Sequence, residues 1–334
     1  MNHDFHVGID VSKLTFDAFV WEKRAHESFR NDACGFEQFA RWLKKQTHGA
    51  ESVLVCFEHT GVYSLQLAIF MEREHLTYAM LPGLQIKQSL GITRGKNDLV
   101  DSMRIAEFAY RFSDKIAAMK LPSAEIRKIH SLLTLRARMM TDMQGYVVAR
   151  NEIRRVVPTD GLLELFASYD RIISDLRAEI KRLEAEIKTV IDGNEALRKT
   201  FALITTVKGV GFVIAAFLIA YTHNFTRFTD WRKFACYAGI APFGCQSGTS
   251  VHGKSQVCSI ANLQAKKMLH LAAMTAVHFD TELREYYIRR QKDGKSKMAI
   301  INIVRNKVIA RVFAVMKRGT PFVDVKKYAI RNSA

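Results

Sequence analysis

The chain has 334 residues and is 48% hydrophobic, which is enough for two or three units with cores of their own. Its 50 Lys and Arg against 33 Asp and Glu give a net charge of +17, which indicates a polyanionic partner, either a nucleic acid or an anionic membrane surface. A membrane-spanning protein is disfavoured, because the longest apolar run, 212–221, is too short to cross a bilayer and the N-terminus has no signal pattern. Five scattered cysteines without zinc spacing fit a reducing cytosol.

The first third of the chain predicts strands followed by alternating helices and strands. Apolar patterning predicts strands at 6–10, 15–21 and 26–30, a helix at 36–46, a strand at 53–58, a helix at 62–74 and a short strand at 78–81. A meander of three strands followed by helix, strand, helix and strand is the element order of a ribonuclease-H-like fold. We therefore expect an α/β domain over residues 1–118.

Four acidic residues accompany these elements. Asp10 and Glu58 each end an apolar run that is typical of a strand buried on both faces, and the carboxyl ends of adjacent parallel strands converge. Asp98 and Asp101 are three residues apart, so they share one face of a predicted helix. Four carboxylates at one place require hard cations, most simply two Mg²⁺. Two such ions on a phosphodiester are a route to strand cleavage or transfer.

The middle of the chain predicts two long helices. The first begins at the N-cap residue Ser123 and ends before a break at 158–161. The second carries apolar residues at alternating steps of three and four, as in a coiled-coil seam: Ile173, Leu176, Ile180, Leu183, Ile187 and Val190. An antiparallel hairpin or dimerisation arm over 119–193 and a plain amphipathic helix packed on its own domain explain the pattern about equally well.

Residues 194–334 predict a second, mainly helical unit. The sequence VKGVGF at 207–212 resembles a helix-hairpin-helix turn that holds a phosphate beside Lys208, although a tight structural turn explains it at least as well. From Arg284 onward there are 14 basic and 3 acidic residues, which indicates packed helices with a basic outer face. The densest cluster is interpreted as a phosphate-contact patch, the alternative being a solvated loop; it comprises Arg289, Arg290, Lys292, Lys295 and Lys297.

Ser247 lies in the small-residue stretch QSGTS, which predicts a loop that could present a hydroxyl to a phosphate. Serine needs activation to act as a nucleophile. A metal ion or the nearby His252 could activate it, and Lys254 could neutralise a phosphate. On residue types alone, a flexible loop with solvent-facing hydroxyls is the more common explanation.

Four sequences taken together resemble a known family: VGIDVSK, FEHTGVYS, GKNDLVDSMRIA and YAGIAPFGCQSGTS. They look like motifs of the DEDD transposases of insertion-sequence family 110, also known as bridge-RNA-guided recombinases. The resemblance runs from about residue 5 to about residue 320. It implies an α/β N-terminal RuvC-like (ribonuclease-H-like) domain, a helical coiled-coil insertion and a mainly α C-terminal transposase domain, here 1–118, 119–193 and 194–334.

The resemblance also implies roles and partners. Asp10, Glu58, Asp98 and Asp101 match the family's acidic positions and would hold Mg²⁺, while Ser247 matches the nucleophile that forms a phosphoserine link to DNA. Dimers that pair into tetramers would form composite sites on target and donor DNA, guided by a noncoding bridge RNA in a bacterial or archaeal cytoplasm, at the nucleoid. Asn97 stands where many relatives have a hydroxyl residue, and Cys245 has no place in the pattern.

Two other functions remain open at this level. A RuvC-like nuclease or junction resolvase would use the carboxylates and water, with Ser247 structural. A non-catalytic nucleic-acid-binding scaffold is disfavoured, because four carboxylates beside a polyanion weaken binding unless metal ions intervene.

Overall fold

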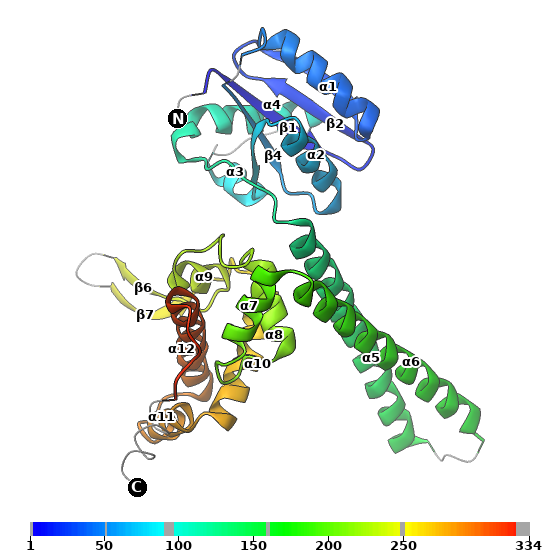
Figure 1. Cartoon of the computed structure of the whole chain (residues 1–334), viewed down its shortest axis with the longest axis vertical. Coiled ribbons are helices and arrows are strands. Elements are labelled where there is room, and N and C mark those ends of the chain that lie inside the picture. The colour runs from blue at the N-terminus through cyan, green and yellow to red at the C-terminus, as the bar shows by residue number, and fades with distance from the viewer. Residues whose placement is uncertain (1–2, 51, 90–96, 158–160, 248–250, 325–334) are drawn as a thin grey trace. The chain divides into compact units, whose positions relative to one another are not determined.

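The computed structural model describes residues 3–50, 52–89, 97–157, 161–247 and 251–324 (Figure 1). The chain divides into two compact units, Met1–Leu121 and Pro122–Ala334. The first is an α/β unit and the second is mainly helical, as predicted. Across the described ranges, every helix is too short or too polar to cross a membrane.

The N-terminal unit is built on a mixed five-stranded sheet with the order β3-β2-β1-β4-β5. The strands β1 (Phe5–Val11), β2 (Thr15–Val20) and β3 (Ala25–Arg30) form an antiparallel meander. The strands β4 (Val53–Glu58) and β5 (Thr77–Leu81) continue the sheet parallel to β1. These strands lie within a residue or two of the predicted ones, because each is a short apolar run between turn residues.

Helices cover both faces of this sheet. On one face α1 (Ala33–Gln46) and α2 (Val62–Arg73) pack on Val7, Ile9 and Phe57. On the other face lie α3 (Gly83–Ser89), α4 (Asp98–Arg111) and a 3₁₀ turn (Ser113–Lys115), with Leu54 and Cys56 of β4 in their core. Because β1 and β4 are covered on both sides, their sequences are apolar almost throughout.

Gly8 fixes helix α4 against strand β1. A Cβ atom at Gly8 would lie 2.1 Å from the backbone nitrogen of Ala106 and 2.2 Å from the carbonyl oxygen of Ser102. Ser102 and Ala106 are fully buried at this crossing. The strand and the helix therefore touch backbone to backbone, which a glycine inside a strand allows and a larger residue does not. The crossing holds the first turn of α4 over the sheet, on the face that carries Asp10.

The second unit begins with a long helical hairpin. Helices α5 (Ala124–Val156) and α6 (Leu163–Asp192) run antiparallel, and ion pairs join them at Lys128–Glu186 (3.0 Å), Arg136–Glu184 (2.7 Å) and Arg150–Asp170 (Figure 1). The seam predicted on α6 is buried at Ile173, Ile180, Leu183 and Ile187. The predicted break at Pro158 lies outside the described residues.

The rest of this unit packs around the base of the hairpin. It comprises α7 (Glu195–Ile204), α8 (Phe212–Tyr221), α9 (Trp231–Tyr237), strands β6 (Pro242–Ser247) and β7 (Val251–Val257), α10 (Leu263–Phe279), α11 (Thr281–Lys292) and α12 (Lys297–Arg318). Their core includes Ile129 of α5 and Ile187 of α6. Domain boundaries at residues 118 and 193 stay predictions.

Candidate functional site

Two of the predicted acidic residues lie at the carboxyl ends of neighbouring parallel strands. The register of β1 and β4 sets Ile9 opposite Phe57, so Asp10 and Glu58 are the next residues along each strand. Both are half-buried, at positions that alternate with the core residues on the other face. Strand pairing therefore brings Asp10 and Glu58 to one edge of the sheet.

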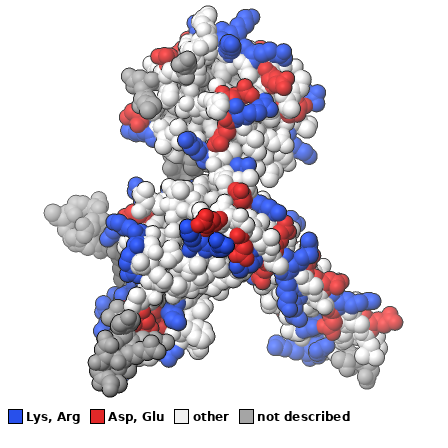
Figure 2. Space-filling view, viewed as in Figure 1, with Lys and Arg blue, Asp and Glu red and all other residues white. Residues whose placement is uncertain are grey.

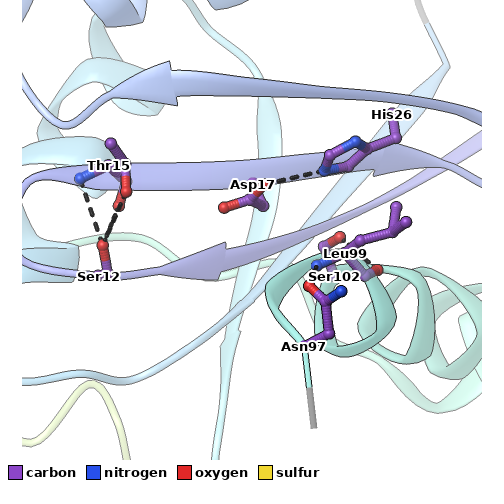
Figure 3. Close-up of polar contacts among 7 residues, drawn as sticks. All are labelled: Ser12, Thr15, Asp17, His26, Asn97, Leu99 and Ser102. Carbon is purple, nitrogen blue, oxygen red and sulfur yellow. Dashed lines mark hydrogen bonds and ion pairs between the residues drawn. The ribbon is translucent and has the colours of Figure 1, made fainter.

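The other two acidic residues lie in the first turn of α4. Asn97 caps this helix, and its side-chain oxygen accepts a hydrogen bond from the backbone N–H of Leu99 at 3.2 Å (Figure 3). The hydroxyl of Ser102 donates to the carbonyl of Leu99 at 2.9 Å. Carboxylates in a first turn interact favourably with the helix dipole, so Asp98 and Asp101 also stabilise the helix that carries them.

Burial and four neighbouring carboxylates together raise the pKa of Asp10. The pKa of Asp10 is raised from 3.8 to about 6, first by burial and then by repulsion from Asp101, Asp98, Glu58 and Asp17. Asp10 therefore interacts electrostatically with each of the other three predicted acidic residues. Within the described ranges, no three Asp, Glu, His or Cys side chains lie close enough together to hold a metal ion.

Sequence reasoning missed two charged residues at this edge. Asp17 of β2 lies directly opposite Asp10, and its carboxylate pairs with the His26 ring on β3 at 2.9 Å (Figure 3). Arg104 of α4 pairs with Asp101 at 3.1 Å. The hairpin register could have indicated Asp17, and the spacing of three residues on a helix could have indicated Arg104.

Ser247 lies in a strand, which corrects the prediction of a loop. It is the last residue of β6 and pairs with Val251 of β7, next to the pair of Gln246 and His252. The segment forms a hairpin because its backbone groups pair across two strands, with an irregularity between Phe243 and Cys245. The side chains of residues 245–255, including Ser247 and Lys254, lie outside the described part of the structure, so their roles stay predictions.

The base of this hairpin is anchored by residues that sequence reasoning did not select. The side-chain amides of Asn302 and Asn306 on α12 both donate to the carbonyl of Ile240, at 2.9 and 3.0 Å. The backbone N–H of Asn262 donates to the carbonyl of Tyr237 at 2.8 Å. The chain is therefore held on both sides of the hairpin, immediately before β6 and after β7. No local sequence pattern identifies the two contacts to Ile240, because they join residues more than 60 positions apart.

Models of transposase families match a segment in each half of the chain. Residues 7–159 match the model of the DEDD transposases of IS110, and residues 201–288 match the model described as "Transposase IS116/IS110/IS902 family". The chain belongs to the IS110 family of transposases. It is thus an enzyme of DNA transposition or recombination, and DNA is its partner.

Individual proteins are also similar to this chain. The transposase is 25% identical to the pilin gene-inverting protein of Moraxella bovis over 324 residues, which is 95% of this chain and 97% of the relative. It is 30% identical to the uncharacterized 43.6 kDa protein of insertion element IS110 from Streptomyces coelicolor, over 52% of this chain and 42% of that protein.

The basic cluster of the transposase spans the end of α11 and the start of α12. Arg290 pairs with Asp293 at 3.3 Å, and three cations lie near the ring of Tyr286: Arg289 at 5.6 Å, Arg290 at 5.5 Å and Lys307 at 4.7 Å. Of the five predicted residues, Arg290 is half-buried and the others are exposed: Arg289, Lys292, Lys295 and Lys297. Contact between these residues and phosphate groups stays a prediction.

The glycine next to Lys208 has a structural role. Gly209 adopts φ +94°, and a Cβ atom there would lie 2.4 Å from the carbonyl oxygen of Ala272 on α10. The VKGVGF turn is therefore glycine-rich because it packs tightly against α10. Lys208 itself is exposed, and its contact with a phosphate stays a prediction.

Gly83→Ala is expected to lower DNA cleavage by about tenfold while the transposase stays folded. A Cβ atom at Gly83 would lie 1.9 Å from Oε1 of Glu58, so an alanine must displace that carboxylate. The displaced group is the end of a flexible side chain, so the fold can adapt. Cleavage rate and thermal unfolding should be measured together. An unchanged cleavage rate would show that the position of Glu58 does not matter.

Proposed function

We propose that this transposase cuts and rejoins DNA strands through a covalent link to Ser247, with Mg²⁺ held by Asp10, Glu58, Asp98 and Asp101. The observation that carries the proposal is the environment of Asp10, whose pKa is raised to about 6 first by burial and then by repulsion from the carboxylates around it, in a chain of the IS110 family. Carboxylates that lie near one another repel when no cation is bound, and their oxygens can bind a cation such as Mg²⁺.

The N-terminal unit is proposed to be RuvC-like. Its strand order β3-β2-β1-β4-β5, with β2 antiparallel to both β1 and β3 and with β4 and β5 parallel to β1, is the order of a ribonuclease-H-like sheet. Asp10 on the central strand, Glu58 on its parallel neighbour and the first turn of α4 are where such a sheet would present catalytic carboxylates.

The acidic residues fit a magnesium site in their chemistry. All four offer carboxylate oxygens, the ligands that Mg²⁺ prefers, and a cation would lower the raised pKa of Asp10. Bound Mg²⁺ would withdraw charge from a phosphodiester and stabilise the charge that develops during its cleavage. Arg104, paired with Asp101, neutralises part of the cluster in the absence of a cation.

The reaction at Ser247 conserves the phosphodiester bond. The serine oxygen forms a bond to phosphorus as the bond to one DNA oxygen breaks, the serine proton leaves to a base, and the released DNA oxygen takes up a proton. Attack by a DNA hydroxyl on the phosphoserine reverses these steps and restores the serine. Rejoining therefore needs no external energy source. The anchored base of the β6–β7 hairpin would hold Ser247 in place.

Guidance by a noncoding RNA is the proposed source of sequence specificity. Base pairing would select target and donor DNA, so the protein needs contacts to the sugar-phosphate backbone and no base-reading motif. The net charge of +17 and the cluster around Tyr286 support such contacts. We further propose dimers that pair into tetramers with composite sites, acting in the cytoplasm at the nucleoid.

The test is a denaturing gel of the protein with its co-purified RNA, Mg²⁺ and labelled junction DNA. Wild type should give a slow, protease-sensitive DNA band, and Ser247→Ala should abolish it. Ser255→Ala, which removes a hydroxyl from the partner strand of the same hairpin, should keep it. Adducts that survive Ser247→Ala would refute the role of this serine, and free ends in every variant would indicate a nuclease that uses water. Binding without cleavage under any condition would indicate a scaffold.

A further inference from the structure

A polar hollow lies where the base of the helical hairpin meets the rest of the second unit. It has a volume of about 300 Å³ and is open to solvent between α5, α8 and α10. Its lining includes Thr134, Arg138, Thr141, Tyr221, Gln264 and Lys267. None of the lining residues is acidic, although carboxylates are common on the neighbouring helix α6.

The two cations of this hollow are not neutralised. Among the described residues, neither Arg138 nor Lys267 forms an ion pair, and both are exposed. Three other cations of α5, Lys128, Arg136 and Arg150, pair with carboxylates of α6. Basic and acidic side chains accordingly alternate along the visible face of the hairpin (Figure 2). The hollow is thus a local site of unbalanced positive charge, formed by one residue from each of two helices.

The other polar groups of the hollow are available as hydrogen-bond donors. The hydroxyl of Tyr221 is protonated at neutral pH, as in any tyrosine, and burial raises its pKa further; no acceptor contacts it among the described residues. The amide of Gln264 likewise has no partner in that set, and Gln264 is the second residue of α10, where the helix dipole is positive. Cations and donors that face one open space suit an anion with several oxygens.

The ring of Tyr221 is not free to stack on a nucleobase. Phe217 stacks on this ring with centroids 4.0 Å apart, and the His130 ring lies 4.9 Å away. The ring is therefore already in contact with two aromatic neighbours, and its free polar feature is the hydroxyl. A site of this kind contacts phosphate groups and reads no sequence.

We propose that this hollow binds phosphate groups of a nucleic-acid backbone through Arg138, Lys267, Tyr221 and Gln264. Its residues are different from the acidic residues, from those of the serine hairpin and from those of the basic cluster around Tyr286. It would attach a nucleic acid to the base of the hairpin whether or not Ser247 is the nucleophile.

The experiment measures binding of the full chain to labelled duplex DNA and, separately, to single-stranded RNA over a range of salt concentrations, with EDTA present so that no strand is cut. The variant Arg138→Gln/Lys267→Gln is compared with Arg177→Gln/Lys181→Gln, which removes the same charge from two exposed residues of α6 that form no ion pair with any described residue. Loss of two phosphate contacts should lower the salt slope by about 1.8 for duplex DNA or about 1.4 for a single strand. The α6 control should change it less.

The outcome distinguishes the two ligands. A reduced slope with DNA alone assigns the hollow to DNA, and a reduced slope with RNA alone assigns it to RNA. Equal slopes for the variant and the α6 control, with both nucleic acids, would overturn the proposal. Tyr221→Phe, which removes only the hydroxyl, should weaken binding of the same nucleic acid about threefold without lowering the salt slope. Because EDTA prevents chemistry, failure of the serine mechanism would leave this result intact.

Discussion

Asp10→Asn is expected to stabilise the metal-free transposase and to abolish DNA cleavage. The pKa of Asp10 is raised from 3.8 to about 6, first by burial and then by the carboxylates around it. The folded state therefore holds the ionised form less well than the unfolded state does. That cost is fully present above pH 6, and it disappears as the pH falls from 6 towards 4.

The expected gain for Asp10→Asn is about 1 to 2 kcal/mol above pH 6 in EDTA, after allowance for solvent screening at this half-exposed group. Near pH 4 the gain should be close to zero. Cleavage should fall by about three orders of magnitude, because a carboxylate that would hold Mg²⁺ is lost. Urea unfolding at both pH values and cleavage with Mg²⁺ measure the two effects.

Asp114→Asn is a matched control for Asp10→Asn in the same unit. Asp114 is exposed and forms no ion pair with any described residue, so its replacement should change neither stability nor cleavage. If Asp10→Asn instead destabilised the protein at both pH values, Asp10 would be held by favourable contacts and the proposed repulsion would be wrong.

Gly8→Ala is expected to destabilise the N-terminal unit by about 3 kcal/mol and to remove cleavage activity. The new methyl group would lie 2.1 Å from the backbone of α4, which cannot adjust as a side chain can. To make room, α4 must move off β1, and Asp98 and Asp101 move with it. Denaturant unfolding together with a cleavage assay measures both consequences.

Gly145→Ala is the control for this substitution. Gly145 lies inside α5, and a Cβ atom there would meet no atom within 4 Å. Alanine should stabilise that helix by about 0.5 to 1 kcal/mol, because it has the higher helix propensity. A Gly8→Ala protein as stable as the wild type would contradict the backbone contact between β1 and α4.

Local patterns were sufficient to predict much of the fold. Strands such as 53–58 are apolar runs between turns, and α6 repeats its apolar residues at heptad spacing, so neighbours along the chain specify each element. Asp10 and Glu58 were identifiable as candidate site residues because each ends such a run. The electrostatic interaction of Asp98 and Asp101 with Asp10 depends on the crossing at Gly8, which no local pattern specifies.

Contacts between distant segments account for what was not predicted. The ion pair of Asp17 and His26 depends on strand register, and the anchoring of Ile240 depends on side chains of α12. The segment around Ser247 carries small residues typical of a loop, and only the pairing of β6 with β7 makes it a hairpin. Tertiary pairing overrides local preference most easily in such sequences.

The packing of the helical hairpin changes along its length. The buried residues of α5 are Ile126, Ile129 and Leu133, all within its first ten residues. Beyond them, the contacts of α5 with α6 include the ion pair of Arg150 with Asp170 and Arg154 over the buried ring of Phe166. We therefore expect amide hydrogen exchange in α5 to be slower over residues 124–133, which share the core of the second unit, than over the residues of α5 that follow.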